Sequence, residues 1–475
     1  MPTSWTNWLT TTTLYEHQRT AVDKLRSIRV GALFMEMGTG KTRAAIELMH
    51  IRRNRIDRVL WFCPVSLKET IRYELRKHTD LPAEALCVFD DRTSMRNVPR
   101  DALVYVIGVE SIGQSNRVTL AANDLITDQT FVIVDESSYI KSHYAKRTER
   151  ITTMAERAKY RLLLTGTPIS QGVVDLFAQM RFLSPSILGY QSYYSFAANH
   201  LEYSEKYPGM IVRSLKTDHL ATKIQPYVYQ VTKDECLDLP AKVSDVRYYL
   251  LTEQQQIAYN QAKDELLPLD QEVGIYDLFK LFTALQEIVS GFWNRRRKTL
   301  EFKHERLDVL ARAINSIPDD QPVIIWCKFQ YSVRQICAML RELYGDASVS
   351  ELHGTVSGKD REAAIERWRQ GKARFLVATQ ATGGHGLTLT EAHYAIFYEN
   401  GFKYAERAQA EDRIHRIGQE HKCTYIDLVA VHSIDERIQS ALSKKADVVA
   451  DFRDRVQQVK DAKDKEALKA LVLEL

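Results

Sequence analysis

The chain has 475 residues, with 65 lysines and arginines against 61 aspartates and glutamates, and its formal net charge is only +4. This length accommodates two or three domains with their own cores, and 45% hydrophobic and 27% charged residues is the composition of an ordinary globular protein. The small net charge excludes a chain that is basic throughout, so any surface that binds a polyanion must be local.

The cysteines and the hydropathy pattern indicate in which compartment the protein is expected. Six cysteines are scattered without a Cys-x-x-Cys pair or a spacing typical of metal ligands, and several lie in apolar, strand-like runs. This pattern indicates a reducing compartment. The first residues contain no basic segment followed by an apolar one, and no run approaches membrane-spanning length. We therefore expect a cytoplasmic protein with no membrane partner.

The first informative elements surround a glycine-rich stretch, Met35–Thr42. Residues 14–26 carry apolar side chains at helical spacing just before it. An apolar, strand-like run at 30–34 leads into the stretch, and a helix-like run at 43–49 follows it. A phosphate-binding loop typically has this order: a strand, a glycine-rich turn, the residues Gly-Lys-Thr and then a helix.

The residue types in this loop suit a nucleotide. Gly38 and Gly40 let backbone N–H groups turn toward an anion, and the following helix adds the positive end of its dipole. Lys41 is placed to reach the β- and γ-phosphates, and the hydroxyl of Thr42 to hold Mg²⁺. Met35 stands where the full pattern has its first glycine. The alternative is a glycine-rich turn before an ordinary helix.

Apolar runs alternate with helical patterns in two parts of the chain. The strand-like runs are 30–34, 58–63, 102–107, 131–134 and 161–164 in the first part, and 322–327, 349–353, 374–378, 394–398 and 424–429 in the second. Such alternation predicts parallel strands that are buried on both faces. The predicted fold is therefore α/β, with two parallel-sheet lobes.

The region between the lobes has a different pattern. From about residue 184 to 300, long helical patterns rich in tyrosine predict a mainly helical insertion. It ends in a basic cluster, 295–298, which is either a solvated loop or a contact to phosphates. The charged helical residues from 446 on are expected to pack back on a lobe, or alternatively to bind a partner. The predicted domains are 1–184, 185–300, 301–445 and 446–475.

Two further stretches follow strands of the first lobe. Asp135 and Glu136 lie directly after the run at 131–134, where open α/β sheets meet ligands. Asp135 is expected to hold Mg²⁺ through its water shell, and Glu136 to orient and deprotonate the attacking water. Alone, the pair equally fits an acidic exit from a strand. Residues 164–168 also follow a strand and are suited to sense the nucleotide, although by themselves they indicate only a turn.

The second lobe contains two arginines near its end. Arg413 and Arg416 are three residues apart in the stretch that begins at Gln409, so on a helix they share one face. Two guanidinium groups aimed at one place suit the charge on a transferring γ-phosphate. An exposed basic helix face is the alternative. The functional interpretation requires the two lobes to face each other across bound ATP.

At these places the chain resembles helicase superfamily two, and within it the Swi/Snf-type DNA translocases. The matching stretches are His17-Gln18, Met37–Thr42, Asp135-Glu136 with Lys141, Leu164–Pro168, Leu176-Phe177, Leu183–Pro185, His353-Gly354, Ala381–Leu389 and Asp412–Gln419. The last is the most diagnostic. Three positions depart from the family pattern: Ser138 replaces a histidine, Gln230 replaces an arginine, and 399–403 lack Trp-Asn-Pro.

The resemblance implies RecA-like lobes and a set of site residues. The implied nucleotide contacts are Gln18, which would contact adenine, Gly38, Thr39, Gly40, Lys41, Thr42 and Gly386. The implied catalytic residues are Lys41, Asp135, Glu136, Gln409, Arg413 and Arg416, and the Mg²⁺ ligands are Thr42 and Asp135. Residues 64–67 and 108–111 stand where the first lobe is expected to contact a DNA strand.

These features predict an ATP- and Mg²⁺-dependent translocase that moves along double-stranded DNA largely without regard to sequence, in replication, recombination or repair. A strand-separating or fork-remodelling helicase is the first alternative. An ATP-dependent scaffold that binds a nuclease or replication partner is the second. The compact chain leaves no room for chromatin-reader domains, which favours a bacterial or viral enzyme, nucleoid-associated or in the host cytoplasm.

Overall fold

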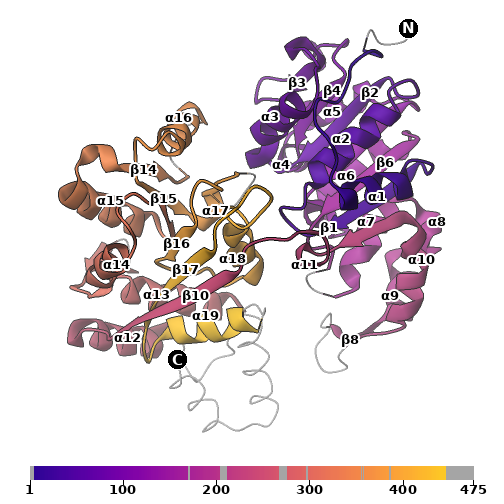
Figure 1. The fold of residues 1–475 in the computed structure, drawn as a ribbon. Helices are drawn as coiled ribbons and strands as arrows, with labels where there is room; N and C mark the ends of the chain where they lie inside the picture. The colour runs from indigo at the N-terminus through magenta and orange to yellow at the C-terminus, as the bar shows by residue number, and fades with distance from the viewer. Residues whose placement is uncertain are drawn as a thin grey trace. The chain divides into compact units, whose positions relative to one another are not determined.

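The computed structural model describes residues 5–169, 172–203, 211–266, 275–295, 298–354, 356, 358–383 and 387–444. The chain divides into two compact units, Met1–Asp238 and Leu239–Leu475, and each is built on its own sheet (Figure 1). The predicted C-terminal helix at 446–475 and the predicted nucleotide contact Gly386 lie outside the described residues.

The first unit contains a seven-stranded parallel sheet with the order β3-β4-β2-β5-β6-β1-β9. Its strands are β1 (Val30–Met35), β2 (Arg58–Cys63), β3 (Leu86–Val88), β4 (Val104–Gly108), β5 (Thr130–Asp135), β6 (Tyr160–Thr165) and β9 (Val228–Val231), and β7 (Leu201–Tyr203) and β8 (Ile211–Ser214) form a separate hairpin. Its helices are α1 (Glu16–Leu25), α2 (Lys41–Ile51), α3 (Lys68–His78), α4 (Val109–Gln114), α5 (Asn116–Leu125), α6 (Lys146–Ala155), α7 (Val174–Leu183), α8 (Pro185–Leu188), α9 (Tyr193–His200), α10 (Thr217–Ile224) and α11 (Lys233–Cys236). Short 3₁₀ turns are η1 (Val65–Leu67), η2 (Ala83–Ala85), η3 (Ser137–Ile140) and η4 (Gln225–Tyr227).

Successive residues of a strand point to opposite sides of the sheet. Nearly all residues of the central strands are buried, so both faces of this sheet are covered. In β1, Leu33 and Met35 pack in one core with residues of α1, α2 and α3. Ala32 and Phe34 pack in a second core with residues of α4 to α7. This double burial explains why the predicted strands were near-continuous apolar runs.

The second unit contains a six-stranded parallel sheet with the order β10-β17-β16-β13-β15-β14. Its strands are β10 (Lys242–Tyr249), β13 (Val323–Cys327), β14 (Val349–Leu352), β15 (Phe375–Thr379), β16 (Tyr394–Phe397) and β17 (Cys423–Ala430), and β11 (Phe292–Arg295) pairs with β12 (Lys298–Glu301) in a hairpin. Its helices are α12 (Glu253–Leu266), α13 (Ile275–Val289), α14 (Arg306–Asn315), α15 (Gln330–Tyr344), α16 (Gly358–Arg369), α17 (Gln380–Gly383), α18 (Tyr404–Glu411) and α19 (Ile434–Ser443), with the 3₁₀ turn η5 (Asp346–Ser348). The prediction of two parallel-sheet lobes is confirmed.

The division between the units falls inside the region 185–300, which the sequence assigned to a separate insertion. Most of its described residues are helical, as predicted, but β9 joins the first sheet and β10 joins the second. Both are edge strands, and β10 exposes most of its residues. An edge strand with exposed polar positions lacks the apolar run by which the central strands were recognised.

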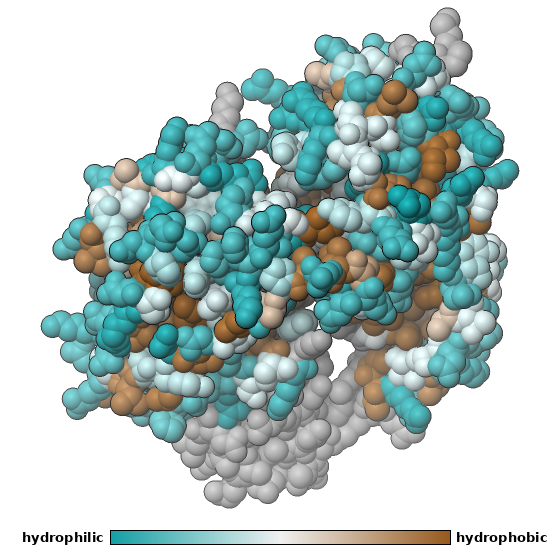
Figure 2. All heavy atoms as spheres, in the orientation of Figure 1, coloured by the Kyte–Doolittle hydropathy of each residue, from teal (hydrophilic) through white to brown (hydrophobic). Residues whose placement is uncertain are grey.

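The surface of the two units is largely polar. Figure 2 shows hydrophilic side chains over most of the visible face, with hydrophobic ones scattered among them. None of the helices in the part of the chain that the structure describes has the length and apolar character needed to cross a membrane.

A buried ion pair connects several elements of the second unit. Arg306, at the start of α14, is 1% exposed, and its Nη2 donates to Oδ2 of Asp435 on α19 at 2.9 Å. The same nitrogen donates to the carbonyl of Leu428 on β17 at 3.1 Å, and Nη1 donates to Ser290 after α13 at 3.2 Å. The guanidinium also lies 5.0 Å from the ring centroid of Tyr398. Its contacts therefore hold two helices against the sheet.

Arg306→Met should lower the free energy of unfolding of the second unit by about 3–5 kcal/mol, because it leaves the buried carboxylate of Asp435 without its partner. Faster amide hydrogen exchange in β17 and α19 would report this loss. The double variant R306M/D435N removes both charges and should lose less stability than R306M alone. Arg312→Met, at an exposed position of the same helix, is the matched control and should change stability by less than about 0.5 kcal/mol.

Candidate nucleotide-binding site

Three predicted motifs of the first unit meet at one edge of its sheet. Met35, Asp135 and Thr165 are the last residues of β1, β5 and β6. These strands are neighbours in the order β5-β6-β1 and run parallel, so their carboxyl ends lie at the same edge. Ligands of open α/β sheets bind at this edge.

The phosphate loop has the backbone conformation that its glycines predict. Gly38 and Gly40 have φ values of 80° and 83°, in the left-handed region that side chains with a Cβ avoid. Helix α2 begins at Lys41, directly after the loop. The Lys41 ammonium donates to the carbonyls of Met35 at 2.9 Å and Glu36 at 3.4 Å. The cationic group thus lies within the loop that is predicted to hold phosphates.

Contacts from two other segments hold the loop in shape. The carbonyl of Thr39 contacts Nε2 of His17 at 2.8 Å and accepts from Nε2 of Gln18 at 3.0 Å, both on α1. The side chain of Glu36 accepts from the backbone N–H of Lys233, just after β9, at 2.7 Å. Gln18 therefore contacts the loop itself, and its contact with adenine stays a prediction. The contribution from beyond β9 was not apparent in the sequence.

The acidic pair combines burial with an unusual backbone. Asp135 is 6% exposed, and its Oδ1 accepts the N–H of Glu136 at 3.0 Å. Burial, together with the charge of Glu136, raises the pKa of Asp135 to about 7, and the positive charge of Lys41 opposes this rise. Glu136 has φ 51° and ψ 58°, a left-handed conformation that is rare outside glycine.

The turn after β6 lies against the phosphate loop. A Cβ added at Gly166 would lie 3.0 Å from Cγ and 3.1 Å from the backbone nitrogen of Met37, so a larger residue would crowd the phosphate loop and force it to shift slightly. The hydroxyl of Thr165 accepts the N–H of Thr167 at 3.1 Å and shapes the turn. The predicted nucleotide-sensing stretch is therefore in direct contact with the loop.

The two stretches predicted to contact DNA also lie together. Residues 64–67 follow β2 and residues 108–111 follow β4, and these strands are neighbours in the sheet. The carboxylate of Glu110 accepts the backbone N–H of Val65 at 3.0 Å. The structure therefore joins them into one local surface of the first unit.

Arg413 and Arg416 do not lie on a helix, so the predicted shared helix face is wrong. Helix α18 ends at Glu411, and the backbone continues in tighter turns. The two side chains nevertheless converge: Nη1 of Arg413 and Nη1 of Arg416 both donate to the carbonyl of Leu387, at 3.1 and 3.3 Å. Arg413 also donates through Nε to the carbonyl of Gln409 at 2.9 Å. The shared contact to the carbonyl of Leu387, rather than helical spacing, brings the two guanidinium groups together.

A magnesium ion fits the donor set of the first unit. Thr42 is the second residue of α2, and the buried carboxylate of Asp135 lies near enough to Lys41 for their charges to interact. A hydroxyl and a carboxylate are hard oxygen donors of the kind that Mg²⁺ prefers, with its remaining positions filled by water and phosphate. Among the described residues, no cluster of three or more His, Cys, Asp or Glu side chains could hold a metal by itself.

Sequence reasoning missed two polar side chains, one half-buried directly after a strand and one buried within a helix. Lys328 follows β13; its Nζ donates to Gln286 at 2.6 Å and lies 3.2 Å from the ring centroid of Phe402, and burial lowers its pKa to about 7. Gln179, on α7, is buried beside the acidic pair. A charged residue directly after an apolar strand was a usable signal for Lys328. A glutamine within an apolar helix gave none.

Known proteins resemble the chain along most of its length. It is 25% identical over 461 residues to an uncharacterized ATP-dependent helicase of Mycoplasma pneumoniae, covering 92% of this chain and 42% of that protein. It is 24% identical over 438 residues to the human DNA annealing helicase and endonuclease ZRANB3, covering 87% of this chain and 38% of that protein. The chain thus spans less than half the length of these curated relatives.

A solved structure, the Sulfolobus solfataricus SWI2/SNF2 ATPase core in complex with dsDNA, matches with a TM-score of 0.45 and 23% identity over 92% of each chain.

Two family models also match in succession. The SNF2-related domain covers residues 7–304, and the helicase conserved C-terminal domain covers residues 305–418. Because the first of them alone matches more than half of the sequence, the chain belongs to the SNF2-related family of helicase superfamily two.

Proposed function

We propose that this chain is a DNA-dependent ATP hydrolase that couples hydrolysis to movement along duplex DNA. One observation carries the proposal: the phosphate loop, the acidic pair and the Thr165–Pro168 turn meet at the carboxyl ends of three adjacent strands. Membership of the SNF2-related family supports the same reaction.

In the proposed reaction, the N–H groups of the phosphate loop and the Lys41 ammonium hold the β- and γ-phosphates. Thr42 and Asp135 hold Mg²⁺, which neutralises phosphate charge when it is bound. Glu136 accepts a proton from the attacking water and orients it toward the γ-phosphate. Arg413, which is supported by the backbone carbonyl of Gln409, and Arg416 supply positive charge to the transferring phosphate. Gln18 and Gly386 complete the proposed nucleotide contacts.

The proposed nucleic-acid partner is double-stranded DNA, gripped by its phosphates. In the first unit, residues 64–67 and 108–111 form the proposed contact surface. Contacts to phosphates carry no sequence information, so binding should be largely sequence-independent and should weaken steeply with salt. A nuclease or replication protein as a further partner also remains a proposal.

A strand-separating or fork-remodelling helicase is a second candidate, because the relatives described above carry the names ATP-dependent helicase and DNA annealing helicase. The two candidates differ in what the motor displaces. A translocase displaces the third strand of a triplex without opening the duplex, whereas a helicase separates a labelled strand from a fork. Measuring both reactions with the same preparation distinguishes them.

The central test is the ATP turnover rate with no nucleic acid, single-stranded DNA, duplex, fork and RNA. We expect duplex to increase turnover most. Lys41→Ala should abolish turnover because the proposed contact to phosphate is lost, while circular dichroism stays unchanged because the hydrogen bonds of Lys41 to Met35 and Glu36 are local to the loop. Lys24→Ala, on α1, is the matched control and should behave as the wild type. Equal turnover with and without duplex would refute the proposed function. ATP and DNA binding with negligible hydrolysis would instead favour a scaffold.

Arg416→Ala should lower kcat by about 10³-fold or more with little change in the KM for ATP, because its guanidinium is proposed to act on charge that develops during transfer. Arg334→Ala removes an exposed arginine of α15 and is the control. A rise in KM with an unchanged kcat would assign Arg416 to ground-state binding instead.

The pH dependence of magnesium-nucleotide binding tests the role of Asp135. Its pKa of about 7 without metal means that a proton must leave before the carboxylate can hold Mg²⁺. The apparent affinity for Mg²⁺–ATP should therefore fall by up to about tenfold for each unit that the pH drops below about 7. Asp135→Asn supplies the baseline, since any slope left in that variant comes from the nucleotide. Identical slopes in both proteins would contradict the assignment.

A further inference from the structure

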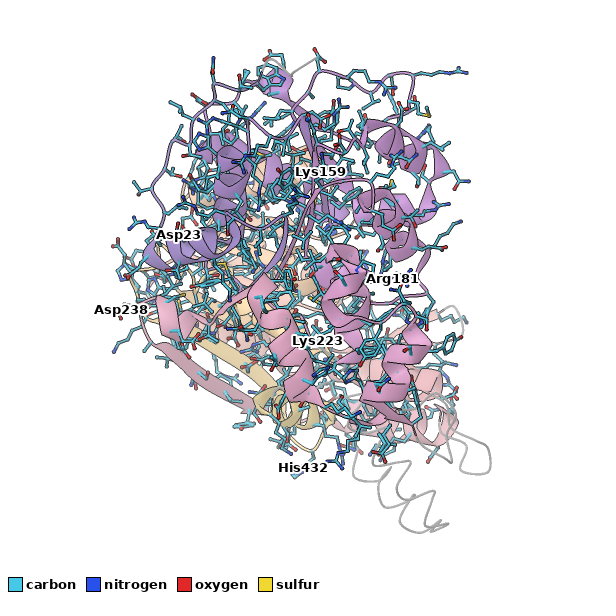
Figure 3. The ribbon with its side chains drawn as sticks, turned by 90° about the vertical axis from the view of Figure 1, so that its right-hand side faces the viewer. Asp23, Lys159, Arg181, Lys223, Asp238 and His432 are labelled. Atoms are coloured by element: carbon cyan, nitrogen blue, oxygen red, sulfur yellow. The ribbon has the colours of Figure 1, made fainter. Side chains whose placement is uncertain are left out.

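Gln179 is a buried polar side chain that joins two parts of the candidate site. It lies on α7 and is 0% exposed, whereas Arg181, two residues further along the same helix and labelled in Figure 3, lies at the surface. The Gln179 Oε1 accepts the hydroxyl of Ser137 at 2.6 Å. Its Nε2 donates to the carbonyl of Pro168 at 2.8 Å and to that of Asp175 at 2.8 Å. Both ends of the amide are therefore used.

The first of these contacts holds the residue next to the proposed base. Ser137 directly follows Glu136 and is itself 0% exposed. Glu136 has the left-handed conformation described above, which persists only where the surroundings impose it. The N–H of Glu136 donates to Asp135 on one side, and its carbonyl accepts the N–H of Tyr139 at 2.9 Å on the other. The Ser137 hydroxyl is the side-chain anchor of this strained segment.

The second contact reaches the turn that lies against the phosphate loop. Pro168 ends the Thr165–Pro168 turn, in which Gly166 lies so close to Met37 that an added Cβ would crowd it. A single side chain thus connects the segment that carries Glu136 with the turn that touches the loop. Because all of these groups are buried or half-buried, a change in one is transmitted through short hydrogen bonds rather than absorbed by water.

We propose that Gln179, acting through Ser137, is a positioning residue for ATP hydrolysis. It holds Glu136 in the strained conformation and ties that conformation to the turn beside the phosphate loop. The inference rests on the proposed function of this site, since it concerns the geometry of the same reaction. Gln179 does not itself contact the phosphates; its effect on the reaction passes through the backbone of Ser137 and Glu136.

Three variants, each measured for stability and for kcat, distinguish a role of Gln179 in positioning Glu136 from a role in packing alone. Ser137→Ala leaves Oε1 of Gln179 without the hydroxyl that donates to it, whereas Gln179→Met removes the acceptor of that hydroxyl and the donor to the carbonyls of Pro168 and Asp175, so each variant should lose both stability and kcat. The double variant S137A/Q179M removes both ends of the Ser137–Gln179 hydrogen bond and replaces them with an apolar contact, so it should be more stable than Gln179→Met alone, although the carbonyl of Pro168 still lacks the donor. Its kcat should nevertheless stay about 10- to 100-fold low, with little change in the KM for ATP, because the base is no longer held in place.

Phe182→Leu, at another buried position of α7, is the matched control: it lowers stability but should keep the wild-type kcat. A double variant with a wild-type kcat would show that the pair serves packing alone and would overturn the inference.

Failure of the proposed function is seen separately, as absence of duplex-stimulated turnover in the wild type or full turnover in Lys41→Ala. An S137A/Q179M protein that unfolds would shift the decision to the single variants, where a loss of kcat no larger than in Phe182→Leu at equal stability also overturns the inference.

Discussion

Strand β6 pairs with β1 on one side and with β5 on the other, and the candidate site depends on this arrangement. Parallel pairing of these three strands places Met35, Thr165 and Asp135 at one edge of the sheet, although they are far apart in the sequence. The pairing is imposed by the apolar strands themselves, which are buried on both faces. The chemistry of the edge is thus supported by a core that contains none of the reacting groups.

Without a nucleotide, the charges at this edge compensate one another only in part. The ammonium of Lys41 is satisfied by carbonyls of its own loop, and the carboxyl of Asp135 is buried deeply enough for its pKa to rise to about 7. A polyanion and a divalent cation would supply the missing charge of each sign.

Backbone and amide groups from other segments hold the charged residues of the candidate site in position. Glu36 of the phosphate loop is fixed by the N–H of Lys233, far along the chain, and Glu136 is fixed through Ser137 by Gln179. In the second unit, one carbonyl, that of Leu387, gathers both Arg413 and Arg416. In each case a neutral backbone or amide group makes the positioning contact.

The sequence by itself determined the two parallel-sheet lobes, the phosphate loop and the acidic pair, because apolar strands buried on both faces and a Gly-x-Gly-Lys-Thr turn leave strong local patterns. It did not determine that β9 and β10 complete the two sheets, since edge strands carry exposed polar residues. Nor did it place Arg413 and Arg416 in turns or join Gln179 to Ser137. Those features depend on hydrogen bonds between residues distant in the chain, and only the folded structure brings such partners together.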